Sequence, residues 1–157
     1  MNKILIVYYS RTGTTKKIAE FIRERLDCDI EEIISVKSRS GVMGYILSGK
    51  EATLKIQAKI KEISKDPANY DLVIVGTPVW AWNISSPIRT YLENNKEKIK
   101  NIAVFCTMGG DGDRQSLAEI EKISGKKIIA QLAFKTKEVQ FGDISEKLEK
   151  FIEKIKR

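Results

Sequence analysis

Four hydroxyl side chains, one arginine and one glycine stand together near the N-terminus. They are Ser10, Arg11, Thr12, Gly13, Thr14 and Thr15. The segment follows an apolar run and opens a helical pattern, so unpaired main-chain N–H groups and the positive end of a helix dipole accompany the hydroxyls. Such donors bind phosphate, and glycine lets the backbone approach it closely. The same residues also suit an ordinary helix cap, and spacing does not decide whether Arg11 faces phosphate or solvent.

A proline-containing segment in the middle of the chain carries both tryptophans. Its residues are Pro78, Val79, Trp80, Ala81, Trp82 and Asn83. Indole offers the largest flat apolar face among the side chains, which suits stacking on a planar ring. The alternative is that both tryptophans anchor the core. Their place in one proline-containing loop favours ligand contact, because binding residues are more frequent on loops than in packed strands.

A third segment combines three glycines with two aspartates after another apolar run. Its residues are Thr107, Met108, Gly109, Gly110, Asp111, Gly112 and Asp113. Glycines allow main-chain N–H groups to approach a ligand with polar ring atoms. A plain turn before a helix capped by Asp113 explains the same residues. The segment therefore indicates a binding loop only in combination with the other two.

Apolar runs alternate with helical patterns along the chain. Their periodicity predicts strands at residues 3–9, 29–36, 70–76, 101–107 and 127–134, the last either ending there or extending into 136–140. It predicts helices at residues 14–27, 51–64, 87–98, 114–124 and 144–156. Residues 37–50 contain three glycines and three serines, which predicts a loop.

This alternation predicts an α/β fold: a three-layer, doubly wound, five-stranded parallel sheet of order 2-1-3-4-5, in a single domain spanning 1–157. Ligands of such sheets bind beyond the carboxyl ends of the strands. The three segments described above follow the first, third and fourth predicted strands. We therefore expect them to form one site.

The sequence resembles the flavodoxin family in two stretches, KILIVYYSRTGTTKKIAEFI and YDLVIVGTPVWAWNISSPIRTYL. The family pattern Ser/Thr-x-Thr-Gly-x-Thr is matched throughout by residues 10–15, and the resemblance covers essentially the full chain. It implies a flavodoxin-like fold with one non-covalent FMN. Residues 10–15 then hold the phosphate, residues 78–83 wrap the ribityl chain with Trp80 stacked on the isoalloxazine, and residues 107–113 meet N5, O4, N3 and O2 of the ring edge.

Two departures from the family bear on function. Family members usually have an aromatic residue in the third loop, and residues 107–113 have none, so Trp82 covers the outer flavin face or that face is open. Electron-carrier flavodoxins are typically acidic, whereas this chain has a net charge of +7. The resemblance implies electron transfer, with a redox partner protein or a small-molecule electron acceptor. The alternative is an NAD(P)H-dependent FMN reductase of quinones or similar acceptors. With either function we expect a monomer or dimer.

The composition limits other chemistry. Histidine is absent, which excludes Ser–His and Cys–His nucleophiles and histidine metal sites, so no catalytic residue and no metal ligand is assigned. Cys28 and Cys106 are expected to be small buried residues of a reduced, cytoplasmic protein. Acidic and basic residues are interleaved, which argues against a nucleic-acid binder. The longest apolar stretches, 3–9 and 71–76, are too short to span a bilayer, so we expect no membrane insertion.

Overall fold

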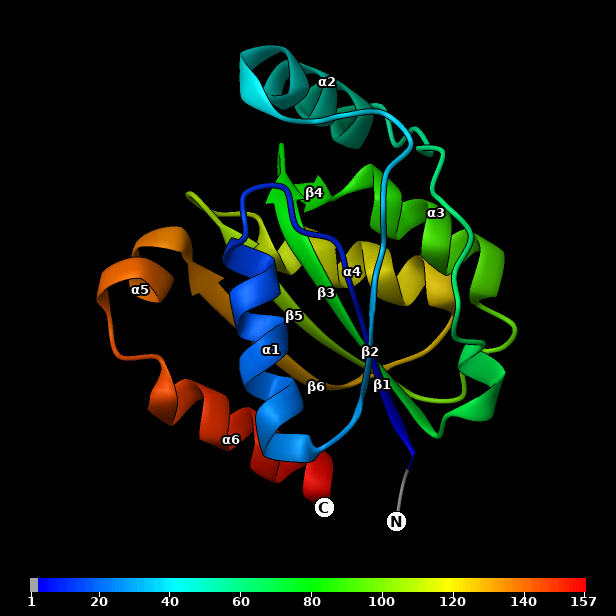
Figure 1. The fold of residues 1–157 in the computed structure, drawn as a ribbon, viewed down its shortest axis with the longest axis vertical. Coiled ribbons are helices and arrows are strands. Elements are labelled where there is room, and N and C mark those ends of the chain that lie inside the picture. Colours follow the sequence, from blue (N-terminus) through cyan, green and yellow to red (C-terminus); the bar gives the residue numbers. More distant parts are fainter. Residues whose placement is uncertain (1–2) are drawn as a thin grey trace.

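A five-stranded parallel sheet lies between layers of helices in the computed structural model, which describes residues 3–157 (Figure 1). The parallel strands follow the order β2-β1-β3-β5-β6, which confirms the predicted order 2-1-3-4-5. A two-residue strand, β4, pairs antiparallel with the end of β3. The strands are β1 (Ile4–Tyr8), β2 (Asp29–Glu32), β3 (Leu72–Trp80), β4 (Asn83–Ile84), β5 (Ile102–Met108) and β6 (Ile128–Lys135).

The helices cover the two faces of the sheet, each over its own apolar core. On one face lie α1 (Thr14–Leu26), α5 (Thr136–Phe141) and α6 (Ser145–Lys156), and on the other lie α3 (Ser86–Asn95) and α4 (Asp113–Ser124). Successive residues of β5, Val104 and Phe105, enter opposite cores and are both fully buried. Strands buried on both faces are almost continuously apolar, as β1 and β5 are, whereas the edge strand β2 is largely polar. Within residues 3–157, no helix is both long and apolar enough to cross a membrane.

The segment between β2 and β3 differs from the prediction. Helix α2 (Gly41–Thr53) occupies most of the predicted loop at 37–50, and residues 54–64 of the predicted helix at 51–64 are not helical. The glycines are compatible with a helix because α2 packs closely on the chain that precedes it. A side chain at Gly44 would overlap the main chain of Arg39. Tertiary contact therefore overrides the low intrinsic helix propensity of glycine here.

Three further boundaries are decided by the structure. Strand β2 was predicted to end at residue 36 but ends at Glu32, and Ser35 forms an isolated bridge with Ile60. The end of the last strand was left open in the prediction, at residue 134 or within 136–140. Residues 136–140 form α5 rather than an extension of β6, because the Glu138 carboxylate accepts a hydrogen bond from the Lys135 main-chain N–H at 2.7 Å and so caps a helix. Strand β3 continues beyond residue 76 to Trp80, and a short η1 turn (Pro67–Asn69) precedes it. The tryptophan segment therefore begins inside the sheet.

Two of the three glycines of α2, Gly44 and Gly49, provide a test of this helix. We expect Gly44→Ala to lower the free energy of unfolding by about 1 to 3 kcal/mol, because the methyl group overpacks against Arg39. Gly49→Ala is the matched control: nothing lies within 4 Å of its added methyl group. It should raise the stability by about 0.5 to 1 kcal/mol, since alanine favours helix. Urea denaturation measures both, and equal effects would contradict the described α2.

Candidate functional site

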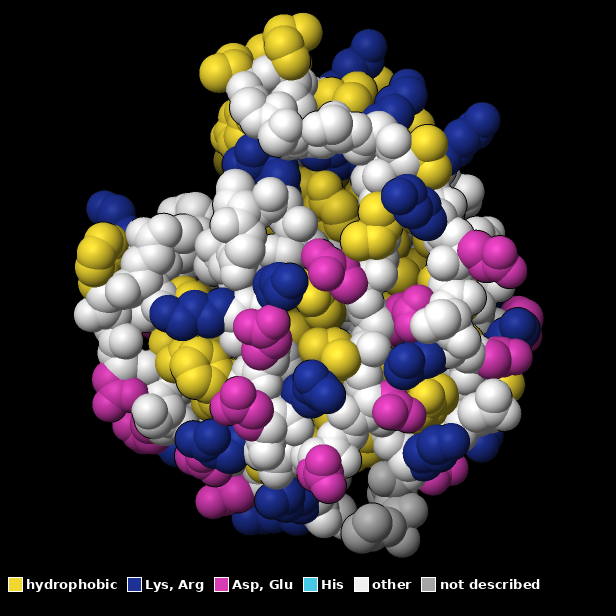
Figure 2. All heavy atoms as spheres, viewed as in Figure 1, with side chains coloured by type: hydrophobic (Ala, Val, Ile, Leu, Met, Phe, Trp, Pro, Cys, Tyr) yellow, Lys and Arg dark blue, Asp and Glu magenta, His cyan; other side chains and the backbone are white. Residues whose placement is uncertain are grey.

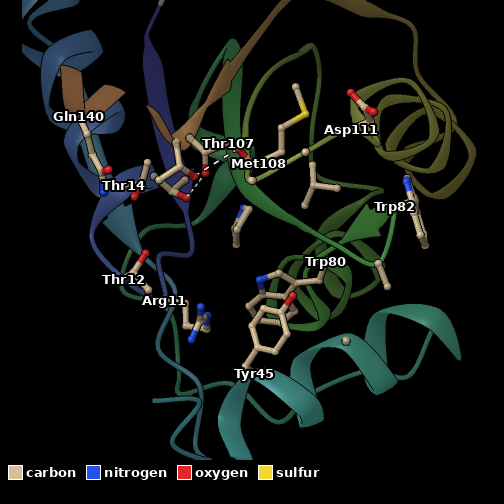
Figure 3. A pocket seen from close by; sticks show the side chains of 18 residues that line it. Arg11, Thr12, Thr14, Tyr45, Trp80, Trp82, Thr107, Met108, Asp111 and Gln140 are labelled. Carbon is tan, nitrogen blue, oxygen red and sulfur yellow. Dashed lines mark hydrogen bonds between the residues drawn. The ribbon is translucent and has the colours of Figure 1, made fainter. Parts of the chain in front are cut away.

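A pocket of about 800 Å³ lies at the carboxyl ends of β1, β3 and β5 (Figure 3). Small-molecule sites have volumes of about 300 to 1,000 Å³. All three segments singled out in the sequence contribute to its wall. The predicted residues that line it are Arg11, Thr12, Thr14, Thr15, Pro78, Val79, Trp80, Ala81, Trp82, Thr107, Met108, Gly109, Gly110 and Asp111. The predicted residues that do not line it are Ser10, Gly13, Asn83, Gly112 and Asp113.

The N-terminus of α1 faces this pocket without a side-chain cap. Gly13 precedes the helix in a left-handed conformation, with φ at 95°, and its N–H donates to the Ser10 hydroxyl at 3.0 Å. Ser10 and Gly13 thus shape the loop from outside the pocket. The hydroxyls of Thr12 and Thr14 make no hydrogen bond within residues 3–157 and line the pocket. First-turn N–H groups and two hydroxyls therefore remain available to an anion.

The first and third segments are joined by one buried contact. The hydroxyls of Thr15 and Thr107 lie 2.8 Å apart, dashed in Figure 3, although 92 residues separate them in the chain. Both residues also line the pocket. The bond fixes the start of α1 against the end of β5.

A strained hairpin joins β3 to β4. Ala81 and Trp82 are both left-handed, with φ at 47° and 59°, which is the geometry of a two-residue type I′ turn but without its usual glycine or asparagine. Trp82 is consequently held at the pocket rim with 64% of its surface exposed. Gly112 packs under the turn, where a side chain would come within 2.7 Å of the Trp82 Cα. The Asn83 side chain accepts a hydrogen bond from Arg89 at 3.1 Å.

Trp80 lies in the wall and is only 8% exposed. Tyr9 meets it edge-on, with ring centroids 5.5 Å apart, and the Arg39 guanidinium lies 5.8 Å from the indole centroid. Edge-to-face aromatic contacts and cation–π contacts both stabilise a fixed ring orientation. The indole is therefore held in place from behind while it still borders the pocket.

A buried ion pair anchors α2 beside Trp80. Arg39 Nη2 donates to Glu51 Oε2 at 2.6 Å, and the Ser86 hydroxyl donates to the same oxygen at 2.6 Å. The Arg39 side chain is almost fully buried, and its Nε and Nη1 have no hydrogen-bond partner within residues 3–157. Because Arg39 precedes α2 and Glu51 lies near its C-terminal end, the pair joins the chain before the helix to its last turns, and Ser86 joins those turns to the start of α3.

Four pocket residues were not predicted: Tyr45 and Gly49 of α2, and Thr136 and Gln140 of α5. The Arg11 guanidinium lies 5.4 Å from the centroid of the Tyr45 ring, so α2 reaches the first segment across one side of the pocket. Thr136 donates to the Met108 carbonyl at 3.2 Å. An aromatic residue between two glycines was the only signal for Tyr45, and the sequence carried no signal for α5.

Neither cysteine is poised for redox chemistry. Cys106 is fully buried, and burial raises the pKa of its thiol to about 12. Cys28 is half-buried rather than buried as expected, and burial together with the nearby Asp29 carboxylate raises its pKa to about 11. Both are free thiols that stay protonated near neutral pH.

The anchoring role of the ion pair can be measured. We expect Arg39→Met to lower the free energy of unfolding by about 3 kcal/mol, because it leaves the Glu51 carboxylate buried without its partner. The double variant Arg39→Met/Glu51→Leu should lose less than the sum of the two single variants. Lys150→Met breaks the exposed pair with Glu146 and serves as the control, with almost no expected change. Additive single and double effects in urea denaturation would refute the coupling.

Comparison with known proteins finds a family model that matches almost the whole chain and a relative that matches part of it. The family model described as flavodoxin matches residues 3–155. A protein of Cupriavidus metallidurans named NAD(P)H dehydrogenase (quinone) is 27% identical over 93 residues, which are 59% of this chain and 46% of that protein. The match thus spans less than half of the relative's length.

Solved structures share the fold. A flavoprotein of Lactobacillus acidophilus, solved in complex with FMN, is 25% identical with a TM-score of 0.71, and the match covers 89% of this chain and 97% of that one. Oxidised flavodoxin 2 of Bacillus cereus is 19% identical with a TM-score of 0.60, covering 98% and 97% of the two chains. The second likeness bears on the fold alone.

Proposed function

Since this chain belongs to the flavodoxin family, we propose that it binds one FMN without a covalent bond in the pocket beyond β1, β3 and β5 and transfers electrons through it. FMN supplies reversible one- and two-electron chemistry when bound, and the protein supplies binding, orientation and electrostatics. One observation carries the proposal. The start of α1, which has no side-chain cap, and the Trp80 indole, whose orientation Tyr9 fixes, border the same pocket.

The phosphate end of the pocket supports FMN rather than riboflavin. Thr12 and Thr14 offer unpaired hydroxyls beside the first-turn N–H groups of α1, and Arg11 adds a positive charge. A dianionic phosphate satisfies such donors, and the helix dipole stabilises it. The likeness to a flavoprotein solved in complex with FMN gives independent support.

The other end of the pocket supports a planar ring system. Trp80 offers an indole that Tyr9 and Arg39 hold in place, and Gly109 and Gly110 line the wall with no atom within 4 Å of either missing side chain. Main-chain groups there are open to the polar edge of a ring. The residues therefore fit a flavin, with Trp80 as the stacking residue and residues 107–111 at the ring edge.

Flavin titration tests this assignment. We expect the wild type to bind FMN and quench its fluorescence. The double variant Thr12→Val/Thr14→Val should weaken FMN binding at least about tenfold, since a hydrogen bond to a charged group contributes about 1.5 to 3 kcal/mol. Riboflavin binding should change little, because riboflavin has no phosphate. Thr53→Val, an exposed position outside the pocket, is the control. A folded wild type that neither carries nor binds FMN would refute the proposal.

A second function, NAD(P)H-dependent reduction of quinones, is favoured by the open side of the pocket. No aromatic residue occurs among residues 107–113, and the exposed Trp82 stands at the rim. A planar acceptor or nicotinamide has room to stack there within a pocket of about 800 Å³. The quinone dehydrogenase of Cupriavidus metallidurans, matched over 46% of its length, supports the same proposed reductase function.

Steady-state kinetics separate the two functions. A reductase form with FMN bound should oxidise NADH or NADPH with menadione faster than free FMN does. Trp82→Ala should then raise the KM for menadione about fivefold, because an aromatic contact contributes about 0.5 to 1.5 kcal/mol beyond its buried area. Phe141→Ala, at an exposed position outside the pocket, should leave KM unchanged. If the FMN-bound protein oxidises NAD(P)H no faster than free FMN does, the reductase function is refuted and electron transfer to a partner protein stays as the proposed function.

A further inference from the structure

Helix α2 buries and exposes the opposite kinds of residues from an ordinary surface helix. Its buried residues are Gly44, Ser48, Glu51 and Ala52, which are small or polar. Its outward residues include Val42 and Met43, each 76% exposed, and Ile46, which is 56% exposed. A surface helix normally buries its large apolar side chains and exposes small or polar ones. Small inward residues seat α2 closely on the protein, and the large apolar residues face away from it.

The exposed apolar residues of this protein are concentrated around α2. Within residues 3–157, eight of the eleven exposed large hydrophobic side chains lie between residues 34 and 56. They are Ile34, Val36, Val42, Met43, Tyr45, Ile46, Leu54 and Ile56. Tyr45 lines the pocket, whereas the other seven do not. Scattered exposed hydrophobic residues need no explanation, but a concentration of them marks a binding surface.

The charges of the same segment have a single sign. Between residues 33 and 61 the exposed charged side chains are Lys37, Lys50, Lys55, Lys59 and Lys61. Its single acidic residue, Glu51, is buried against Arg39, and Lys55 also pairs with Glu119 of α4. Met43, Ile46 and Lys50 are spaced by three and four residues, so an apolar strip and a positive charge share one side of the helix.

The shape of this surface is a protruding end rather than a groove. Figure 1 shows α2 at one end of the long axis of the molecule. Figure 2 shows hydrophobic side chains at that end with Lys and Arg side chains beside them, whereas the acidic side chains on this face lie farther from it. We call Val42, Met43, Ile46 and Leu54, together with Lys37 and Lys50, the α2 tip.

We propose that the α2 tip docks this protein on the surface of anionic phospholipid membranes. Apolar side chains enter the boundary between headgroups and acyl chains, and lysines meet the anionic headgroups. The net charge of +7 adds long-range attraction. Pairing of two tips from two copies of the chain would instead bring lysines together, with no exposed acidic residue between 33 and 61 to balance them. Surface docking moves no segment across the bilayer and so differs from membrane insertion.

Docking has a consequence for the pocket, and this consequence rests on the proposed flavin function. Tyr45 and Gly49 of the same helix line the pocket. A docked α2 tip therefore brings the pocket close to the lipid surface, where apolar acceptors such as long-chain quinones concentrate. The docking itself depends only on the surface of α2.

Cosedimentation with vesicles tests the docking. Wild-type protein should pellet with vesicles of phosphatidylglycerol and phosphatidylcholine at low salt, and not with phosphatidylcholine vesicles alone. The triple variant Val42→Ser/Met43→Gln/Ile46→Gln should lower the partition coefficient at least about tenfold, because it removes the apolar contact. Ile129→Gln/Phe141→Gln removes two exposed hydrophobic residues elsewhere and should bind as the wild type does.

Two double variants of equal net charge distinguish the effect of lysines at the α2 tip from the effect of the protein's net charge. Lys37→Gln/Lys50→Gln should weaken binding at least about tenfold, since each lysine at a membrane surface contributes about a factor of five. Lys122→Gln/Lys127→Gln removes the same charge from exposed positions outside the segment and should weaken it much less. Each assay is repeated with and without added FMN, so a failure of flavin binding is seen separately from a failure of docking.

Three results would overturn the docking proposal. The first is wild-type protein that stays in the supernatant with anionic vesicles at low salt. The second is equal binding by the triple variant and the wild type. The third is a wild type that sedimentation velocity finds to be a dimer and a triple variant that it finds to be a monomer, because a second copy would then cover the α2 tip.

Discussion

Parallel pairing brings Tyr8 of β1 beside Gly76 of β3, and Pro78 of β3 beside Thr107 of β5. Because these strands run in the same direction, the segments that follow them leave from one edge of the sheet. The pairing at Gly76 leaves no room for a side chain, since the Phe105 ring fills that space. The close pairing of β1, β3 and β5 thus brings three parts of the pocket together: the hydroxyl-rich start of α1, Trp80 at the end of β3, and the glycine-rich loop after β5.

Two kinds of contact then hold those segments in a fixed relation. The Thr15–Thr107 hydroxyl bond is buried and joins the first segment to the third. The contacts of Trp80 with Tyr9 and Arg39 join the second segment to the residue just before the first segment and to the chain just before α2. The left-handed Ala81 and Trp82 add strain, which costs about 1 to 3 kcal/mol for each such residue and is kept where surrounding structure enforces it. These contacts fix the three segments around the pocket without the help of a ligand contact.

Helix α2 contributes to the pocket wall on one side and to the outer surface on the other. The Arg39–Glu51 pair and the close approach at Gly44 fix the inner side of the helix, and Tyr45 reaches the pocket near Arg11. Its outer side carries the exposed apolar residues of the α2 tip. The choice of small residues inside and large residues outside makes sense if one helix serves as pocket wall and docking surface together. A purely structural helix would gain free energy from the reverse arrangement.

The sequence alone determined the layered fold, because short apolar runs such as residues 3–9 have the length of buried strands and alternate with helical periodicity. The strand order followed from the doubly wound arrangement that this alternation favours. The sequence also located most of the pocket wall, since Thr12, Trp80 and Gly109 each follow a predicted strand, although Trp80 is in fact the last residue of β3. It failed where local propensity and tertiary contact disagree. Glycines that predict a loop at 37–50 instead let α2 pack on Arg39, and so Tyr45 was missed.

What only the tertiary structure decided is which side chains face the pocket and which support it from behind. Ser10 and Gly112 carry the same local signal as Thr12 and Gly110, yet they shape loops outside the pocket. The Arg39–Glu51 pair left no pattern in the sequence, because its partners meet through the path of the chain around α2 and the packing against Ser86. Periodicity reports how a segment is buried, whereas contacts between distant segments depend on the whole arrangement of the sheet and its helices.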